Sequence, residues 1–317
     1  MTKIDRRNLP IEDVDVIVLG AGPAGINCAL ELNEYKIEAL VVDRNSLPGG
    51  QLPDIPSFIP NLSSGTAENG KAVQKSLCDA VIAAKLKVVL NESVQHCDLG
   101  KLQFQTANHV YQCKTAFLAT GYRVRRLPHE ENYSRFSKEI FYNTGATPHE
   151  FDGKTVAVIG GGDSALLEAL ERAATAERVY IINRSDSFKA RRHVMNDVKA
   201  NERIQVLTNQ VLHDLIGDNC LKQIELRSTT DDTTQQLDVD KLIVKIGYAP
   251  NTEIFAGQID MDSSGHIRVE PDCRTSVNAV FAGGDIVTPG FDRIANAMGN
   301  GIVAARSIRM YLESLSN

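Results

Sequence analysis

The stretches VIVLGAGPAG (residues 16–25) and VAVIGGGDSA (residues 156–165) carry the same pattern. In each, a short apolar run ends in G-x-G-x-x-G or G-x-G-x-x-A, and a helical pattern follows. A second apolar run then ends at the same distance from the first glycine in both copies, at Asp43 and at Asn183. One such motif is weak evidence. Two with matching spacing predict two dinucleotide-binding βαβ units in one chain, the layout of a flavoprotein that also binds a nicotinamide.

Length and composition are those of a globular protein with two domains of ordinary size: 317 residues, 43% hydrophobic and 23% charged. The net charge of −6 indicates no basic surface for nucleic acid or an anionic membrane. No apolar stretch approaches the ~20 residues of a transmembrane helix, and residues 1–10 are polar, unlike a signal peptide. We therefore expect a cytoplasmic protein with no nucleic-acid or membrane partner.

The six cysteines have no C-x-x-C spacing. They are too few for a disulfide framework in a chain of this length, which agrees with a reducing cytosol. No two cysteines or histidines have the spacing of metal ligands, so no metal site is expected.

The periodicity of apolar residues places the elements of both units. Residues 14–19 and 40–42 indicate buried strands on either side of a helix at 23–34, and the second βαβ unit occupies 154–183. Residues 44–70 are rich in Pro, Gly, Ser and Asn and predict a long loop. Loops of that length without secondary structure are usually functional or disordered, and the glycines within this one favour a function.

The second unit lies in the middle of the chain, so the simplest packing inserts it into the first. We expect an α/β fold of two Rossmann-like, three-layer dinucleotide-binding domains. Residues 1–121 and 249–317 form the first domain, and residues 122–248 form the inserted second domain. A strand at about 279–282 and a final helix at about 293–313 complete the first domain.

In the first motif each glycine has a separate task. Gly20 allows the tight turn, Gly22 lets a diphosphate approach the backbone, and Gly25 lets the helix pack close to the strand. The diphosphate then lies at the helix N-terminus, where free N–H groups and the helix dipole favour anions. Asp43 is placed to accept hydrogen bonds from ribose hydroxyls.

The second motif differs where a nicotinamide nucleotide would place its adenosine ribose. Asn183 replaces the acid that favours a free 2′-hydroxyl, and Arg184 follows it. Lys189, Arg191 and Arg192 come soon after. Losing the acid and gaining cations favours a 2′-phosphate, hence NADPH over NADH. The alternative is a solvated basic patch.

Near the C-terminus, Gly283-Gly284-Asp285 follows a strand-like run. The glycines indicate another close approach of the backbone to a cofactor, with Asp285 bound to a polyol. A β-turn capped by the aspartate explains the same residues.

At these residues the chain resembles the low-molecular-weight thioredoxin reductase family nearly from end to end. The matching motifs are GAGPAG at 20–25, GGQL at 49–52, ATG at 119–121, GGGDSA at 160–165, NRSDSFKA at 183–190, IGYAPNT at 246–252 and FAGGDI at 281–286. The resemblance implies FAD in the first domain, NAD(P)H in the second, and a homodimer built through the FAD domains.

The motifs and the resemblance together give the expected site residues. For FAD these are Gly20, Gly22, Pro23, Ala24, Gly25, Asp43, Gly50, Gln51, Thr120, Gly121, Asp285, Arg293 and Ile294. For NAD(P)H they are Gly160, Gly162, Asp163, Ser164, Ala165, Arg184 and Lys189.

Three places depart from the family pattern. The Cys-x-x-Cys pair that the family carries before the second motif is Asn143-Thr144-Gly145-Ala146 here, which excludes a dithiol relay at that place. The His-Arg-Arg of the 2′-phosphate site is Asn183-Arg184-Ser185, and its later Arg is Lys189, a point charge without the planar guanidinium. The Arg-Gln pair that opens the last helix is Arg293-Ile294.

Two groups of relatives also lack the cysteine pair. Ferredoxin/flavodoxin–NADP reductases of the same fold usually add a C-terminal extension over the flavin, whereas this sequence ends directly after the predicted helix. Bacilliredoxin reductases place a cysteine in the first motif, where this chain has Ala24. Cys28 lies one helical turn further on, and we interpret it as core packing, with a redox role as the alternative.

Three functions follow from these observations. The favoured one is an FAD-dependent oxidoreductase that passes electrons between NAD(P)H, with NADPH favoured, and an external acceptor without an internal dithiol. The acceptor would be a ferredoxin, a flavodoxin or a small molecule. One alternative is a low-molecular-weight disulfide reductase that uses a single cysteine. The other is a non-catalytic flavin-binding regulator with a degenerate or repurposed second site.

Overall fold

The computed structural model describes residues 9–55, 58–62, 65–145, 148–287, 289–290 and 292–315. The chain forms two compact units, which are described separately: unit 1 comprises Met1–Arg123 and Ala249–Asn317, and unit 2 comprises Val124–Tyr248. The chain passes between the units along β9 (Tyr122–Val124) and β18 (Tyr248–Pro250), which pair as a two-stranded ribbon.

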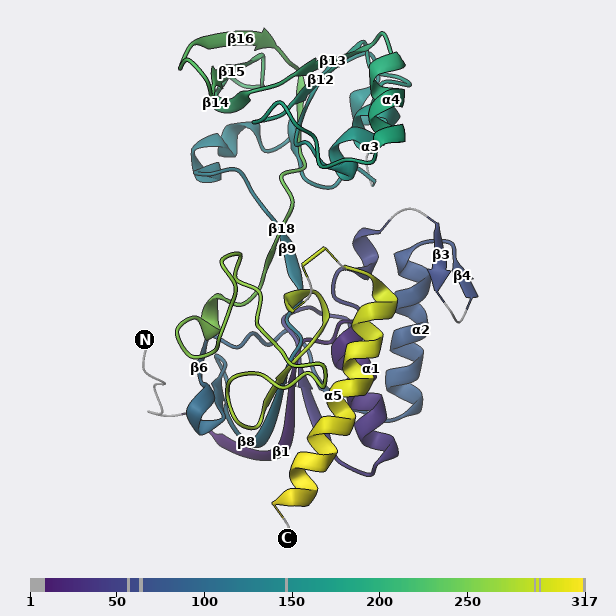
Figure 1. Ribbon diagram of the computed structural model, residues 1–317, viewed down its shortest axis with the longest axis vertical. Coiled ribbons are helices and arrows are strands. Elements are labelled where there is room, and N and C mark those ends of the chain that lie inside the picture. Colours follow the sequence, from purple (N-terminus) through teal and green to yellow (C-terminus); the bar gives the residue numbers. More distant parts are fainter. Residues whose placement is uncertain are drawn as a thin grey trace. The chain divides into compact units, whose positions relative to one another are not determined.

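Unit 1 is built on a seven-stranded sheet in the order β5-β2-β1-β8-β7-β6, with β19 also paired to β8 (Figure 1). Strands β5, β2, β1, β8 and β19 pair in parallel, β7 pairs antiparallel with β8, and β6 pairs antiparallel with β7. The strands are β1 (Ile11–Leu19), β2 (Ala39–Val42), β5 (Lys87–Val89), β6 (His96–Asp98), β7 (Gln103–Gln105), β8 (Val110–Leu118) and β19 (Val280–Ala282). The apolar run 16–19 is buried on both faces, as parallel strands under two layers require.

Helices α1 (Pro23–Glu34), α2 (Gly70–Ala83) and α5 (Ile294–Ser314) cover one face of this sheet (Figure 1). Helices α1 and α5 approach closely because Gly301 has no side chain: a Cβ there would overlap the carbonyl oxygen of Ala24. The opposite face packs against the segment that contains Phe255, Ile259 and Ile267.

The stretch 44–70, expected to be a loop, contains short elements where the structure describes it. These are the 3₁₀ helix η1 (Leu52–Asp54) and a hairpin of β3 (Ile59–Leu62) and β4 (Gly65–Ala67). Leu52, Ile59 and Val73 form a small apolar cluster of their own, which gives this polar stretch a reason to be ordered.

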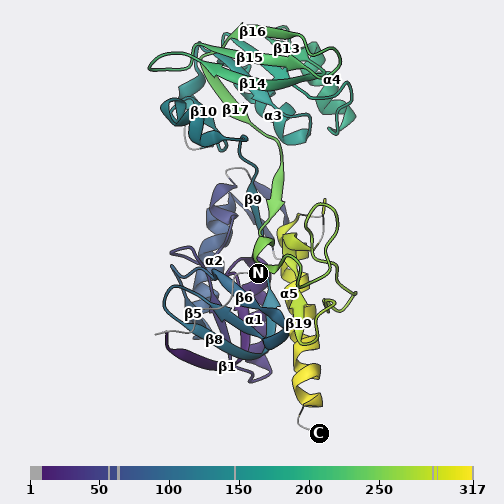
Figure 2. The ribbon, with the colours of Figure 1, turned by 90° about the vertical axis from the view of Figure 1, so that its left-hand side faces the viewer.

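Unit 2 has a five-stranded parallel sheet in the order β10-β17-β11-β12-β13. Its strands are β10 (Ile140–Phe141), β11 (Thr155–Ile159), β12 (Arg178–Ile182), β13 (Ile204–Leu207) and β17 (Lys241–Val244). Helices α3 (Asp163–Arg172) and α4 (Arg192–Ala200) pack on one face. The antiparallel strands β14 (Gln210–Ile216), β15 (Gln223–Ser228) and β16 (Thr234–Asp238) cover the other (Figure 2). The result is a second three-layer unit.

Five further 3₁₀ helices complete the described chain: η2 (Leu99–Lys101), η3 (Glu130–Phe136), η4 (Pro148–Phe151), η5 (Glu253–Phe255) and η6 (Gly284–Ile286). None of the helices within the described ranges has both the length and the apolar character needed to cross a membrane. The same ranges hold no group of three or more His, Cys, Asp or Glu side chains suited to a metal ion.

Candidate dinucleotide sites

The first glycine loop joins β1 to α1 in unit 1. The Gly20 amide donates to the carbonyl of Val42 at 2.9 Å, and φ at Gly20 is +109°. A Cβ at Gly20 would overlap the carbonyl oxygen of Ala119, and one at Gly25 would overlap that of Gly20. Gly22, in contrast, has no atom within 4 Å of its Cβ position. Packing therefore fixes the outer glycines, while the middle one leaves room beside the N-terminus of α1, as a bound diphosphate requires.

Asp43 supports this loop from the end of β2. It is 8% exposed, and its Oδ2 accepts a hydrogen bond from the Ala21 amide at 2.6 Å while its Oδ1 accepts one from Asn45 at 2.7 Å. The ionised carboxylate has lone pairs beyond these two bonds, so it can still accept from a ribose hydroxyl. Asp43 therefore shapes the loop in addition to the ligand role predicted for it.

Four further predicted positions come together at the carboxyl end of the same sheet. The Cβ position of Gly50 lies 3.3 Å from Cα of Gly22, and that of Gly121 lies 3.9 Å from Nε2 of Gln51. Gln51 Nε2 in turn lies 3.5 Å from Oδ2 of Asp285. Burial, and secondarily the charge of Asp292, raises the pKa of the Asp285 carboxyl to about 6.

Two asparagines hold these residues in place, and the sequence analysis missed both. Asn251 accepts at its carbonyl from the Thr120 hydroxyl at 2.6 Å and donates from Nδ2 to the Thr120 carbonyl at 2.8 Å. Asn300 Oδ1 accepts from the Gly284 amide at 3.1 Å, next to Asp285. The local signal for Asn300 in the sequence is its place between two glycines, Gly299 and Gly301, of the final helix.

The two residues expected at the start of α5, Arg293 and Ile294, have different surroundings. Arg293 is exposed, and its guanidinium donates to the carbonyl of Asp292 at 3.1 Å. Ile294 packs against the cluster of Leu52, Ile59 and Val73. An apolar residue at 294 thus serves the packing of this small cluster.

The second glycine loop joins β11 to α3 in unit 2 and repeats the geometry of the first. The Gly160 amide donates to the carbonyl of Ile182 at 3.0 Å, φ at Gly160 is +143°, and a Cβ there would overlap the carbonyl oxygen of Lys245. Gly162 again has no atom within 4 Å of its Cβ position. Ala165 replaces the third glycine, and its Cβ lies 3.0 Å from the Cβ position of Gly160. The loop fits a second dinucleotide for the same reasons as the first.

The segment after β12 closes over this loop. Asn183, 6% exposed, donates from Nδ2 to the carbonyls of Ser185 at 2.9 Å and Ser187 at 2.8 Å. The Lys189 amide donates to the carbonyl of Gly161 at 2.9 Å. The side chains of Arg184 and Lys189 are exposed and form no ion pair with any described carboxylate. Ser164, also expected at this site, is exposed in the first turn of α3.

A buried polar network occupies the position of the family's dithiol. The Thr144 hydroxyl donates to both carboxylate oxygens of Glu168 at 2.7 Å. Glu168 also forms ion pairs with Arg172, at 3.1 Å to Nε, and with Lys245, at 3.3 Å to Nζ. The exposed fractions of the Glu168, Arg172 and Lys245 side chains are 9%, 4% and 16%. The paired charges and hydrogen bonds make this region a fixed structural contact.

Three cysteines of unit 1, Cys28, Cys97 and Cys113, lie in poor environments for redox chemistry. Cys28 is fully buried, and burial, with smaller contributions from Cys273 and Glu31, raises the pKa of its thiol well above the usual range. Burial also raises the pKa of Cys97 to about 11 and that of Cys113 to about 12. Thiols that remain protonated at neutral pH are weak nucleophiles. The interpretation of Cys28 as core packing is therefore favoured, and we do not propose a single-cysteine disulfide reductase that uses it.

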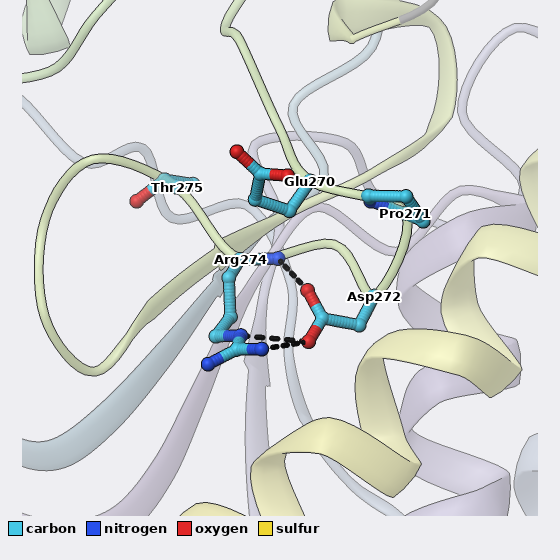
Figure 3. A pocket seen from close by; sticks show the side chains of 5 residues that line it. All are labelled: Glu270, Pro271, Asp272, Arg274 and Thr275. Atoms are coloured by element: carbon cyan, nitrogen blue, oxygen red, sulfur yellow. Dashed lines mark hydrogen bonds and ion pairs between the residues drawn. The ribbon is translucent and has the colours of Figure 1, made fainter.

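A hollow of about 580 Å³ lies elsewhere in unit 1, lined by Glu270, Pro271, Asp272, Arg274 and Thr275 (Figure 3). Its Asp272 carboxylate is occupied by Arg274, whose Nε donates to Oδ2 at 2.7 Å. The hollow contains none of the predicted cofactor residues.

Comparisons with known proteins agree with this geometry. Residues 14–301 match the family described as pyridine nucleotide-disulphide oxidoreductase. A thioredoxin reductase of Streptomyces clavuligerus is 29% identical over 315 residues, which cover 96% of this chain and 95% of that protein. The 34.2 kDa protein in the rubredoxin operon of Clostridium pasteurianum is 27% identical over 308 residues, covering 95% and 98%.

Solved structures share the fold. Lactococcus lactis thioredoxin reductase in its FR conformation has a TM-score of 0.82 at 24% identity, with 95% of this chain and 99% of that chain covered. The bacillithiol disulfide reductase Bdr of Staphylococcus aureus has a TM-score of 0.74 at 18% identity, covering 94% and 99%. The predicted α/β fold with two Rossmann-like sheets is confirmed. Because the family match spans most of the sequence, the chain belongs to the pyridine nucleotide-disulphide oxidoreductase family, as a flavin-dependent enzyme of the thioredoxin reductase-like kind.

Proposed function

We propose that this enzyme passes electrons between NADPH, bound in unit 2, and an external acceptor through FAD, bound in unit 1, without an internal dithiol. The observation that carries the proposal is the segment at Asn143-Thr144-Gly145, which has no thiol and whose Thr144 hydroxyl is bonded to the buried Glu168. Among the cysteines of unit 1, burial raises the pKa of Cys28, Cys97, Cys113 and Cys273, so these thiols are poor replacements for the missing pair.

In unit 1 the protein would supply binding and orientation. The open backbone at Gly22 and the N-terminus of α1 receive the diphosphate, and Asp43 accepts from the ribose. Asp285, with Gln51 beside it, hydrogen-bonds the polyol chain. FAD, when bound, supplies the redox chemistry by taking up a hydride from reduced nicotinamide and releasing electrons to the acceptor.

We assign the preference for NADPH to Arg184 and Lys189. Both are exposed cations without an ion-pair partner among the described residues, and Asn183 removes the carboxylate that would repel a 2′-phosphate. Replacing Arg184 by alanine should raise the KM for NADPH about tenfold and leave that for NADH within about twofold, because only NADPH carries the extra phosphate. An equal rise for both nucleotides would refute this assignment.

The acceptor would be a ferredoxin, a flavodoxin or a small molecule, because an exposed dithiol is not available to reduce a protein disulfide. The first test is anaerobic titration of the flavin absorbance with NADPH, with NADH and with reduced ferredoxin. We expect NADPH to bleach the flavin, and a screen of acceptors would then follow turnover. Bleaching by none of the three would favour a non-catalytic flavin-binding regulator.

We also propose a homodimer formed through unit 1. Three apolar side chains of α5 support it, since Ile302, Val303 and Met310 are 46%, 39% and 57% exposed. Val303 and Met310 are seven residues apart and so share one face of the helix, and an apolar patch that is contiguous on the surface marks an interaction site. Light scattering coupled to size-exclusion chromatography should give twice the mass of one chain, and Met310→Glu should shift the mass toward the monomer.

A further inference from the structure

Asp163 carries a negative charge at the helix N-terminus where the second nucleotide site would bind a diphosphate. Asp163 is the first residue of α3, directly after the open glycine Gly162. Its side chain is 37% exposed. A diphosphate placed at this helix N-terminus would meet the Asp163 carboxylate, and the repulsion between like charges would weaken binding.

Arg191 compensates this charge. Its backbone amide donates to Asp163 Oδ1 at 2.7 Å, and its Nε donates to Oδ2 at 2.6 Å, so one residue holds both oxygens. The hydrogen bond from the Arg191 amide, followed by that from its side chain, lowers the pKa of Asp163. The carboxylate therefore stays ionised at neutral pH, and the Arg191 guanidinium beside it offsets its charge.

The same pair connects two parts of the site. Asp163 belongs to the glycine loop, and Arg191 is the N-cap of α4, at the end of the segment that begins at Asn183. Together with the bond from the Lys189 amide to the Gly161 carbonyl, the pair attaches this segment to the glycine loop. Arg184 and Lys189 remain without a carboxylate partner among the described residues, so they are available for a different part of the ligand.

We propose that Arg191 is a positioning residue that neutralises Asp163 and thereby sets the affinity for the diphosphate shared by NADP(H) and NAD(H), separately from the 2′-phosphate assigned to Arg184. The inference rests on the proposed function, because it takes unit 2 as the nicotinamide nucleotide site. Arg191 itself makes no contact with the ligand in this arrangement. Its effect is exerted through the charge of Asp163.

Isothermal titration calorimetry of the FAD-loaded enzyme at fixed ionic strength tests the proposal. The probes are NADP⁺, NAD⁺ and 2′-AMP, which lacks the diphosphate. Arg191→Met should weaken NADP⁺ and NAD⁺ equally, about three- to tenfold, and leave 2′-AMP within about twofold. Asp163→Asn should bind both dinucleotides at least as tightly as the wild type. Arg178→Met is the matched control, since it removes the same charge at the exposed start of β12, far along the strand from the glycine loop.

The double variant Asp163→Asn/Arg191→Met separates charge from structure. If Arg191 acts by neutralising Asp163, removing both restores the dinucleotide affinities to within about twofold of the wild type. A double variant as weak as Arg191→Met, or a loss of 2′-AMP binding in Arg191→Met, overturns the proposal, because Arg191 would then bind the ligand or hold the segment open. Should the wild type bind neither dinucleotide, the proposed function itself fails and the inference fails with it.

Discussion

In the first glycine loop a carboxylate accepts hydrogen bonds, whereas in the second an amide donates them. Asp43 accepts from the Ala21 amide, within the glycine loop. Asn183 stands at the equivalent strand end but donates to the carbonyls of Ser185 and Ser187. The two loops share their backbone geometry. Where the first has the carboxylate of Asp43, the second has the amide of Asn183, which donates to the carbonyls of the turn that follows it.

Substitutions at the third glycine position of each motif, Gly25 and Ala165, should give the largest difference in unfolding free energy between the two loops. Gly25→Ala places a Cβ on the carbonyl oxygen of Gly20, and the crowded backbone cannot yield, so we expect a loss of more than about 3 kcal/mol of unfolding free energy. Ala165→Gly in the second loop removes a methyl group that already fits and should cost about 1 kcal/mol. Urea unfolding and the ratio of FAD to protein measure both. Similar losses in the two variants would show that the loops are not packed as described.

The buried acid of unit 2, Glu168, is held by cations. Glu168 is paired with Arg172 and Lys245, so Glu168→Gln removes the carboxylate that pairs with Lys245 and the buried one of the two carboxylates that pair with Arg172, and should cost about 3 kcal/mol. The control is Glu171→Gln, which removes the exposed carboxylate that pairs with the same Arg172; the Glu171 side chain is 67% exposed, so its loss should cost less than about 0.5 kcal/mol. Urea unfolding of the whole enzyme provides the measurement. A small loss for Glu168→Gln would mean that the network contributes little.

Substitutions that exchange the carboxylate and the amide at the two strand ends, Asp43 and Asn183, test the comparison of the two loops directly. Asp43→Asn removes one acceptor oxygen from buried amides and should cost about 1–2 kcal/mol and weaken FAD binding. Asn183→Asp places a carboxylate against two carbonyl oxygens, and should cost a similar amount and reduce the ratio of NADPH to NADH affinity. Thermal unfolding and ligand titration give both quantities. If Asn183→Asp raised the preference for NADPH, the role given to this position would be wrong.

The smallest expected effect on the unfolding free energy is a gain rather than a loss. Asp285 has a pKa raised to about 6 by burial, so above that pH its ionised form destabilises the flavin-free protein. Asp285→Asn should therefore increase the unfolding free energy of the apoprotein by on the order of 1 kcal/mol at pH 8, after allowing for solvent screening. The gain should shrink as the pH falls below about 6 and vanish below about 4, where the carboxyl is protonated in both states. Urea titrations at pH 4.5, 6 and 8 measure it, and a gain independent of pH would contradict this origin.

Much of the first site was predictable because its signals are local. Gly20, Gly22 and Gly25 and the acid at the strand end recur at fixed offsets, since a βαβ unit has fixed strand and helix lengths. The network at Thr144 was not predicted. A hint exists in α3, where Glu168 and Arg172 share the helix face of the buried Ala165 and Ala169, a position at which charged side chains need partners. The partners themselves, Thr144 and Lys245, are far away in the sequence.

The sequence by itself determined the two βαβ units, their glycine turns and the loss of the dithiol, because each depends on residues within one short segment. Only the tertiary structure decided which distant groups meet: Gln51 with Asp285, Asn251 with Thr120, and Arg191 with Asp163. The physical reason is that sheet order and loop packing bring these segments together. A hydrogen bond depends on atomic separations of about 3 Å, which no sequence spacing specifies.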